Sequence, residues 1–143
     1  MTAFQHLNAL ADQHKAARHP SFPAKYTPSS KYSDRDANGL TRCIVDYLNL
    51  SGHFGTRLAS TGTYRADLQK FVHSQQRAGL PDVFGVVDGR AVFVEVKVGK
   101  DRLSDVQKQT IHQLEQAGAW VYVADSFQGF YDWFKVEFLT PPF

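Results

Sequence analysis

The chain has 143 residues, of which 43% are hydrophobic and 13% aromatic, and this is enough apolar material for a packed core. Its formal net charge of +2 is too small for a protein that coats nucleic acid without selectivity. The single cysteine, Cys43, excludes an internal disulfide, and we expect it to be buried. No apolar run nears the ~18 residues of a membrane span and no signal peptide is visible, so we expect a cytoplasmic protein with no membrane partner.

The first 37 residues differ in composition from the rest, and we expect an N-terminal helix and proline-rich arm over 1–37 and the main domain over 38–143. Residues 2–18 predict an amphipathic helix that packs against the core or a partner. Its apolar side chains at helical spacing are Phe4, Leu7, Leu10 and Ala11. Prolines and serines then indicate an extended arm, which Tyr26 and Tyr32 could anchor.

A helix and a strand are expected next, followed by a polar loop. The helix spans residues 40–50, with Asn38 as its cap, and its apolar face consists of Leu40, Ile44, Tyr47 and Leu48. Residues 53–60 predict a strand, on which Arg57 either contacts a phosphate or is simply exposed. Residues 60–80 show no clear period, so we predict a loop with at most one helical turn. Its basic side chains, which suit a nucleic-acid backbone or a solvated loop equally, are Arg65, Lys70 and Arg77.

The dipeptide Asp88-Gly89 lies between two apolar runs and is a strong signal for a two-residue β-hairpin, because both turn residues need positive φ. Counting partners outward from this turn places Asp82 directly opposite Glu95, with Cβ atoms roughly 4.5–5.5 Å apart. Lys97 lies two residues beyond Glu95 and therefore shares the same face of the strand. The hairpin thus predicts a cluster of two carboxylates and one amine.

Two facing carboxylates are unfavourable, since they repel by about 4 kcal/mol at ~4 Å and an effective dielectric constant of ~20. Lys97 offsets one of the charges, and a divalent cation would balance the other. Mg²⁺ suits such a site because it binds through one or two carboxylates and keeps waters for a substrate phosphate. The alternative is an ordinary strand with a solvated edge, and a one-residue slip would turn Asp82 to the opposite face.

The segment after the hairpin predicts a basic loop and a helix over residues 105–117. Ser104 and Gln107 form a capping box at the start of that helix, which is a structural alternative to any role of Gln107 in a site. The side chains expected to face the core are Val106, Ile111 and Leu114. The cations near the helix N-terminus, a favourable place for phosphate, are Lys100, Arg102 and Lys108.

The C-terminal part predicts a strand over residues 119–125 and a closing helix capped by Ser126. That helix carries an aromatic stripe that is typical of a core or a dimer contact, made of Phe127, Phe130, Tyr131 and Phe134. The order after the N-terminal segment is therefore helix, three strands, helix, strand, helix. This order predicts an α/β fold in which helices flank a mixed sheet.

These residues resemble the PD-(D/E)xK nuclease superfamily, through Pro81-Asp82, then Glu95-Val96-Lys97 on the second hairpin strand, then Gln107 in the next helix. The order G-x-P-D, hairpin, E-V-K, basic loop and S-x-x-Q is similar to the VRR-NUC branch over about residues 38–134. That branch includes small phage and bacterial proteins similar to Holliday-junction resolvases. The resemblance implies a restriction-endonuclease-like core (αβββαβ) with an extra N-terminal helix and arm.

The resemblance also implies roles for the clustered residues. Asp82, Glu95 and the carbonyl of Val96 would bind Mg²⁺ or Mn²⁺. Lys97 would orient or help deprotonate the attacking water, and Gln107 would support the site from the helix. The implied activity is that of a metal-dependent endonuclease that hydrolyses DNA, with branched or four-way-junction DNA as the candidate substrate. The resemblance also implies a homodimer of bacterial or phage origin.

One departure from the family pattern concerns the first helix of the core, where many members carry a glutamate and this chain has none. The nearby substitutes are Asp36, Asn38 and Asp46, and the sequence does not choose among them. An alternative hypothesis is therefore a catalytically inactive nucleic-acid-binding module of a phage or mobile element. A third is a protein-interaction module that uses the N-terminal arm and the aromatic helix.

Overall fold

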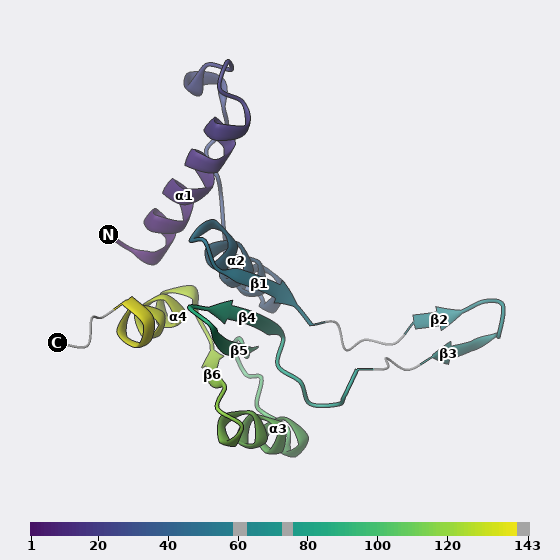
Figure 1. The fold of residues 1–143 in the computed structure, drawn as a ribbon. Helices are drawn as coiled ribbons and strands as arrows, with labels where there is room; N and C mark the ends of the chain where they lie inside the picture. The colour runs from purple at the N-terminus through teal and green to yellow at the C-terminus, as the bar shows by residue number, and fades with distance from the viewer. Residues whose placement is uncertain (59–62, 73–75, 140–143) are drawn as a thin grey trace.

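The computed structural model describes residues 1–58, 63–72 and 76–139, whose arrangement is shown in Figure 1. In chain order the elements are α1 (Ala3–Arg18), the short 3-10 helix η1 (Ala24–Tyr26), α2 (Ala37–Leu50), β1 (Phe54–Arg57), β2 (Thr63–Arg65), β3 (Lys70–Val72), β4 (Val83–Val87), β5 (Arg90–Val96), α3 (Asp105–Gln116), β6 (Trp120–Ala124), α4 (Phe127–Phe134) and the π-helix η2 (Lys135–Leu139).

The main sheet has the strand order β1-β4-β5-β6. The pairs β1–β4 and β4–β5 are antiparallel, and β5–β6 is parallel, with α3 as the crossover between them. The mixed sheet and the core order α2, β1, β4, β5, α3, β6 confirm the predicted α/β class and the αβββαβ sequence of elements.

The β4–β5 hairpin has the predicted register. Val87 pairs with Arg90 and Phe84 with Phe93. Asp88 and Gly89 take φ values of 51° and 78°, so both turn residues adopt the left-handed region that this turn type needs. The side-chain alternation set by this register decides which residues reach the site.

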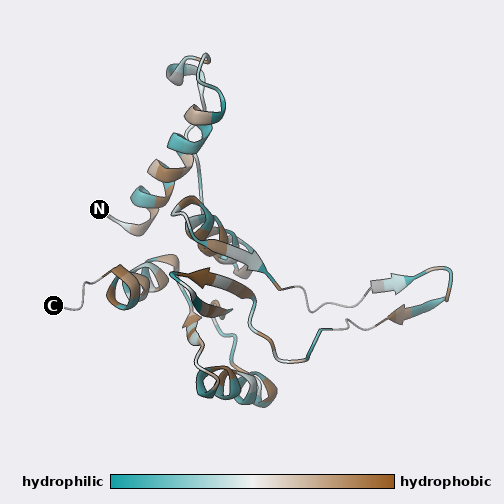
Figure 2. Cartoon of the chain, viewed as in Figure 1, coloured by the Kyte–Doolittle hydropathy of each residue, from teal (hydrophilic) through white to brown (hydrophobic). Residues whose placement is uncertain are grey.

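The core lies on one face of the sheet, beneath α1, α2 and α4. β4 and β5 contribute their buried valines to this face, α2 contributes its apolar stripe and α4 its aromatic stripe. Figure 2 shows β4 as largely hydrophobic, whereas α1 alternates between hydrophobic and hydrophilic residues. The aromatic stripe is thus core, as predicted, and Cys43 is fully buried, which raises the pKa of its thiol to about 12.

The N-terminal helix packs on the main domain. Ala3, Leu7 and Ala11 are buried, and His6 Nδ1 lies 3.1 Å from the hydroxyl of Tyr131 on α4. The arm that follows is anchored by Tyr32, whose hydroxyl donates to Asp46 Oδ2 at 2.8 Å. Tyr26, the other predicted anchor, is 64% exposed and does not serve that purpose.

Two predictions about the helices were wrong. The N-cap of α2 is Asp36 instead of Asn38, since Asp36 Oδ1 accepts from the amide of Gly39 at 2.6 Å. On α3, Val106 is 48% exposed, and Thr110 is the buried residue instead.

The segment predicted as a loop contains the strands β2 and β3, which form a separate hairpin that extends away from the sheet (Figure 1). Each strand has three residues and little apolar alternation, which is why no strand period is visible in the sequence. None of the described helices combines the length and apolarity that a bilayer crossing needs.

Candidate active site

The four residues predicted to form the site come together at one edge of the main sheet. Asp82 immediately precedes β4, Glu95 is the second-last residue of β5, and Lys97 follows β5 directly. Gln107 reaches them from the first turn of α3, on the face of the sheet opposite α2. Two strands of one hairpin and the start of one helix therefore build the cluster.

Asp82 is held beside Glu95 by the backbone of both neighbouring strands. Its Oδ2 accepts a hydrogen bond of 2.8 Å from the amide of Val96. Its own carbonyl accepts from the amide of Leu58, just beyond β1, also at 2.8 Å. The last pair of the β4–β5 ladder is Val83 with Val94, and one further step in the same register brings Asp82 opposite Glu95, as predicted.

Glu95 is the most unusual side chain of the site, because it is a carboxyl group with only 2% of its surface exposed. Its Oε1 accepts from Gln107 Nε2 at 3.2 Å and lies 3.9 Å from Lys97 Nζ. Its Oε2 is buried and accepts no hydrogen bond from any donor among the described residues. A buried oxygen without a donor is costly, and it marks a place where a cation would be favourable.

The pKa of Glu95 is raised to about 8, chiefly because burial penalises the charged form. The hydrogen bond and charge of the Asp82 carboxylate raise it further, and Lys97 lowers it. Near neutral pH the protonated Glu95 can donate to Asp82, so the pair carries about one negative charge. Such a strongly perturbed group beside a charged partner is typical of functional sites.

Gln107 has two contacts that the sequence presented as alternatives. Its Oε1 accepts from the amide of Ser104 at 2.9 Å, and its own amide donates to Ser104 Oγ at 3.1 Å, which completes the capping box. Its Nε2 remains available and donates to Glu95. The helix cap therefore fixes the amide that holds the carboxyl group.

The donor set of the site fits a hard divalent cation. Asp82 and Glu95 would hold it, with the carbonyl of Val96 as the further ligand proposed from the sequence. Within residues 1–58, 63–72 and 76–139 no cluster of three or more His, Cys, Asp or Glu side chains is present. The protein side of the site thus offers two carboxylates, not three.

The three suggested substitutes for the helix glutamate have other partners. The Asp36 carboxylate caps α2, and that of Asp46 accepts from Tyr32 and lies 3.6 Å from Arg42 Nε. Asn38 accepts two hydrogen bonds from the Arg57 guanidinium, at 2.7 and 3.1 Å.

The predicted DNA-binding cations divide into four groups. Arg102 and Lys108 line, together with the site residue Lys97, one shallow hollow of about 290 Å³ beside the site, and Lys100 is exposed in the loop that borders it. Arg57 lies on β1 at the same edge of the sheet.

The remaining predicted cations lie on the β2–β3 hairpin and beside α3. Arg65 and Lys70 face each other on the β2–β3 hairpin, where Arg65 is paired with Asp67. Arg77 donates to Gln113 on α3. The sequence therefore identified cations on separate elements, and only those of the first two groups lie near the carboxylates.

A residue that sequence analysis overlooked fixes the distance between the hairpin and α3. Gly79 has φ of 81°, and a Cβ at this position would lie 2.7 Å from Val106 Cγ1 and 2.8 Å from Thr110 Oγ1. Only glycine allows the chain before Asp82 to approach the helix so closely. The signal was present in the G-x-P-D motif, where the glycine precedes the aspartate by three residues.

Comparison with known protein families finds a match. The family model described as VRR-NUC domain matches residues 55–128, more than half of the chain, and this range contains Asp82, Glu95, Lys97 and Gln107. No curated protein matches the chain.

Proposed function

Since this chain belongs to the VRR-NUC domain family of PD-(D/E)xK-like nucleases, we propose that it is a divalent-metal-dependent endonuclease that hydrolyses phosphodiester bonds of DNA, with branched or four-way-junction DNA as its preferred substrate. The observation that carries the proposal is the buried Glu95 carboxyl beside Asp82, with one oxygen that has no donor among the described residues. A cation at this point would satisfy that oxygen and remove the repulsion between the two acids.

In the proposed mechanism each side chain has a separate task. Asp82 and Glu95 bind the divalent ion, which when present supplies Lewis-acid polarisation of the phosphate and a more acidic water. Gln107 keeps Glu95 Oε1 in place, so that the free oxygen points to the ion-binding position. Lys97, which is 20% exposed, orients the attacking water and stabilises the negative charge that grows on the phosphate.

Cleavage assays test this proposal. Supercoiled plasmid, linear duplex and four-way-junction DNA are incubated with Mg²⁺ or Mn²⁺ and with wild-type protein, Asp82→Asn or Lys97→Ala. The matched control is Asp88→Asn, which removes an acid from the same hairpin at the turn, where φ of 51° suits asparagine equally. We expect cutting by wild type and control, and a loss of 10²-fold or more in the two site variants. Equal cutting by all four proteins would overturn the proposal.

A second candidate function is DNA binding without cleavage. It is favoured by the two-carboxylate site, since no third acid joins Asp82 and Glu95 among the described residues. Tight junction binding with no cleavage in any divalent metal would support this function over the first.

We also propose that the protein acts as a homodimer, which would place two sites on two strands. Support comes from the face of the sheet opposite α2, where Phe54 and Val86 oppose each other and are 53% and 39% exposed. Val123 on the same face is 39% exposed. Sedimentation equilibrium at micromolar concentration checks this, and a monomer at all concentrations would contradict it.

A further inference from the structure

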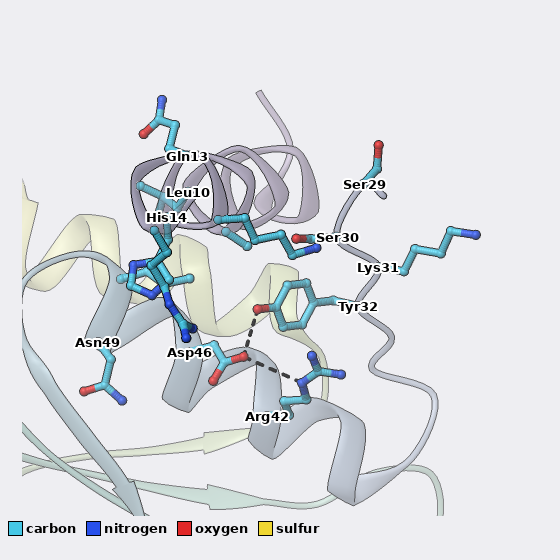
Figure 3. Close-up of a pocket in the computed structure, with 14 residues that line it drawn as sticks. Leu10, Gln13, His14, Ser29, Ser30, Lys31, Tyr32, Arg42, Asp46 and Asn49 are labelled. Atoms are coloured by element: carbon cyan, nitrogen blue, oxygen red, sulfur yellow. Dashed lines mark hydrogen bonds and ion pairs between the residues drawn. The ribbon is translucent and has the colours of Figure 1, made fainter. Parts of the chain in front are cut away.

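A groove outside the nuclease site separates the N-terminal segment from α2. It has a volume of about 750 Å³ and lies between α1, the arm and the outer side of α2 (Figure 3). Its lining residues come from positions 10–50, so none of them belongs to the part of the chain that matches the family. We call this feature the α1–α2 groove.

The α1–α2 groove is strongly cationic. Four basic side chains line it, Lys15, Arg18, Lys31 and Arg42, against the single acid Asp46, which gives a net charge of +3 with His14 neutral. Arg18 and Lys31 are exposed, and neither forms an ion pair with any described residue. The protein as a whole has a formal charge of only +2, so this groove concentrates positive charge.

The one acid in the groove is already neutralised. Asp46 accepts from the Tyr32 hydroxyl at 2.8 Å and lies 3.6 Å from Arg42 Nε, as the dashed lines in Figure 3 show. Arg42 in turn lies over the Tyr32 ring, 4.9 Å from its centre. Lys15 Nζ donates to the Pro28 carbonyl at 3.2 Å, so Arg18 and Lys31 are the cations left to an external anion. Serine, asparagine and glutamine side chains complete a polar lining.

The groove continues toward the edge of the sheet that carries the site. A second hollow of about 330 Å³ shares Lys31, Tyr32 and Arg42 with it and extends to Asn38. Asn38 accepts from Arg57, and Arg57 lies directly opposite Val83, the residue after Asp82. The two hollows therefore form a continuous lining along α2 that contains Arg42 and Lys31 and ends at Asn38, beside the end of the sheet where the carboxylates lie.

The length of α2 along this lining can be compared with the axial length of a DNA duplex. From Leu50 to Asn38 the helix rises about 18 Å. This is the axial length of about five base pairs at ~3.4 Å per pair. Arginine and lysine with hydroxyl and amide neighbours are the groups that contact DNA phosphates without reading sequence.

We propose that the α1–α2 groove binds the phosphate backbone of a DNA segment outside the cleavage site, for example a second arm of a branched substrate. The choice of DNA as ligand rests on the proposed nuclease function, but the residues of the groove are separate from the proposed catalytic residues. The N-terminal helix and arm thus extend the DNA contact surface of the domain.

The test is DNA binding in EDTA, where no cleavage takes place. Fluorescence anisotropy measures the affinity of Arg18→Gln/Lys31→Gln for a four-way junction, a duplex and a single strand. The matched control is Lys25→Gln/Arg90→Gln, which removes two exposed cations that do not line the groove. We expect the groove variant to bind junction DNA about tenfold more weakly at ~0.1 M salt, and the slope of log K against log salt to fall by about 2.

Several results would overturn the inference. These are an unchanged salt slope in the groove variant, an equal loss in the control, or a polyglutamate peptide that binds wild type but not the groove variant and leaves DNA binding intact. The charge-reversal variant Arg18→Glu/Lys31→Glu, at the same exposed positions, must weaken binding further, and thermal melting confirms that each variant is folded.

Failure of the groove and failure of the nuclease proposal are distinguishable. If the protein cuts no DNA, binding in EDTA still tests the groove. If the groove proposal is correct, Arg18→Gln/Lys31→Gln keeps the wild-type cleavage rate on a short duplex at saturating concentration. Lys97→Ala, in contrast, loses cleavage, while its DNA binding keeps most of the wild-type salt slope. Normal junction binding by the groove variant of an active nuclease would refute the groove alone.

Discussion

Replacing Glu95 with glutamine measures how strongly the fold is destabilised by a buried carboxyl group at the site. Glutamine has nearly the same shape, its carbonyl can accept from Gln107, and its amide can donate to Asp82. The substitution therefore removes the titratable proton while keeping the hydrogen bonds of the site. We expect Glu95→Gln to be more stable than wild type at pH 7 in the absence of divalent ions.

The magnitude follows from the pKa shift and its sign. The pKa of Glu95 rises from 4.5 when unfolded to about 8 when folded, so between these values the folded state holds a proton that the unfolded state has lost. Wild-type stability therefore falls as pH rises from about 4.5 to about 8. At pH 7 the full linkage term is about 3 kcal/mol, and we expect about 2 kcal/mol because glutamine also loses its attraction to Lys97.

Thermal melting from pH 4 to pH 9 in EDTA measures this difference. For a chain of this size we expect Tm of Glu95→Gln to exceed that of wild type by about 6–8 °C at pH 7 and to match it at pH 4. Glu115→Gln, an exposed substitution on α3, is the control and should change little at any pH. A constant difference between Glu95→Gln and wild type across the pH range would refute the reasoning, because it would show that Glu95 ionises normally in the folded protein.

Three further predictions address the same site and its supports. Mn²⁺ affinity should rise about tenfold per pH unit up to about pH 8 and then level off, because the ion must displace the Glu95 proton. Calorimetry in two buffers should find that about one proton is released per ion bound. A Mn²⁺ affinity that does not change with pH would contradict this prediction. Gly79→Ala should destabilise the fold by about 2 kcal/mol or more and weaken metal binding, as measured by urea unfolding and calorimetry, because of its positive φ and the contact with Val106. Asp36→Ala should lower the free energy of unfolding by about 1 kcal/mol and Asn38→Ala by less, in line with the observed cap; the reverse order would restore Asn38 as the cap.

Local sequence was sufficient where the chain determines its own geometry. The Asp88-Gly89 turn fixes the hairpin register, and the register alone brings Asp82 to Glu95. The capping box was equally visible, because its two members, Ser104 and Gln107, are only three residues apart in the sequence. These features depend on neighbours in the sequence, so reading the sequence recovers them.

The remaining features depend on packing between distant segments. Asp36 and Asn38 are both good caps, and which of them begins α2 depends on how the arm approaches the helix. The burial of Glu95 requires α3 to lie over the strand, and the α1–α2 groove requires residues 1–37 to dock on α2. No local pattern contains these distances, and the short strands β2 and β3 were overlooked because three residues carry too little periodicity.

The close packing at Gly79 links the two halves of the site. Asp82 and Glu95 belong to the hairpin, whereas Gln107 belongs to α3, and α3 makes only a limited contact with the sheet through β6. Gly79 allows the segment before Asp82 to pack closely against Val106, which is one residue before Gln107. A shift of α3 would therefore move Gln107 away from Glu95 and displace Asp82 at the same time. The geometry of the carboxylates and the position of the helix are therefore set together.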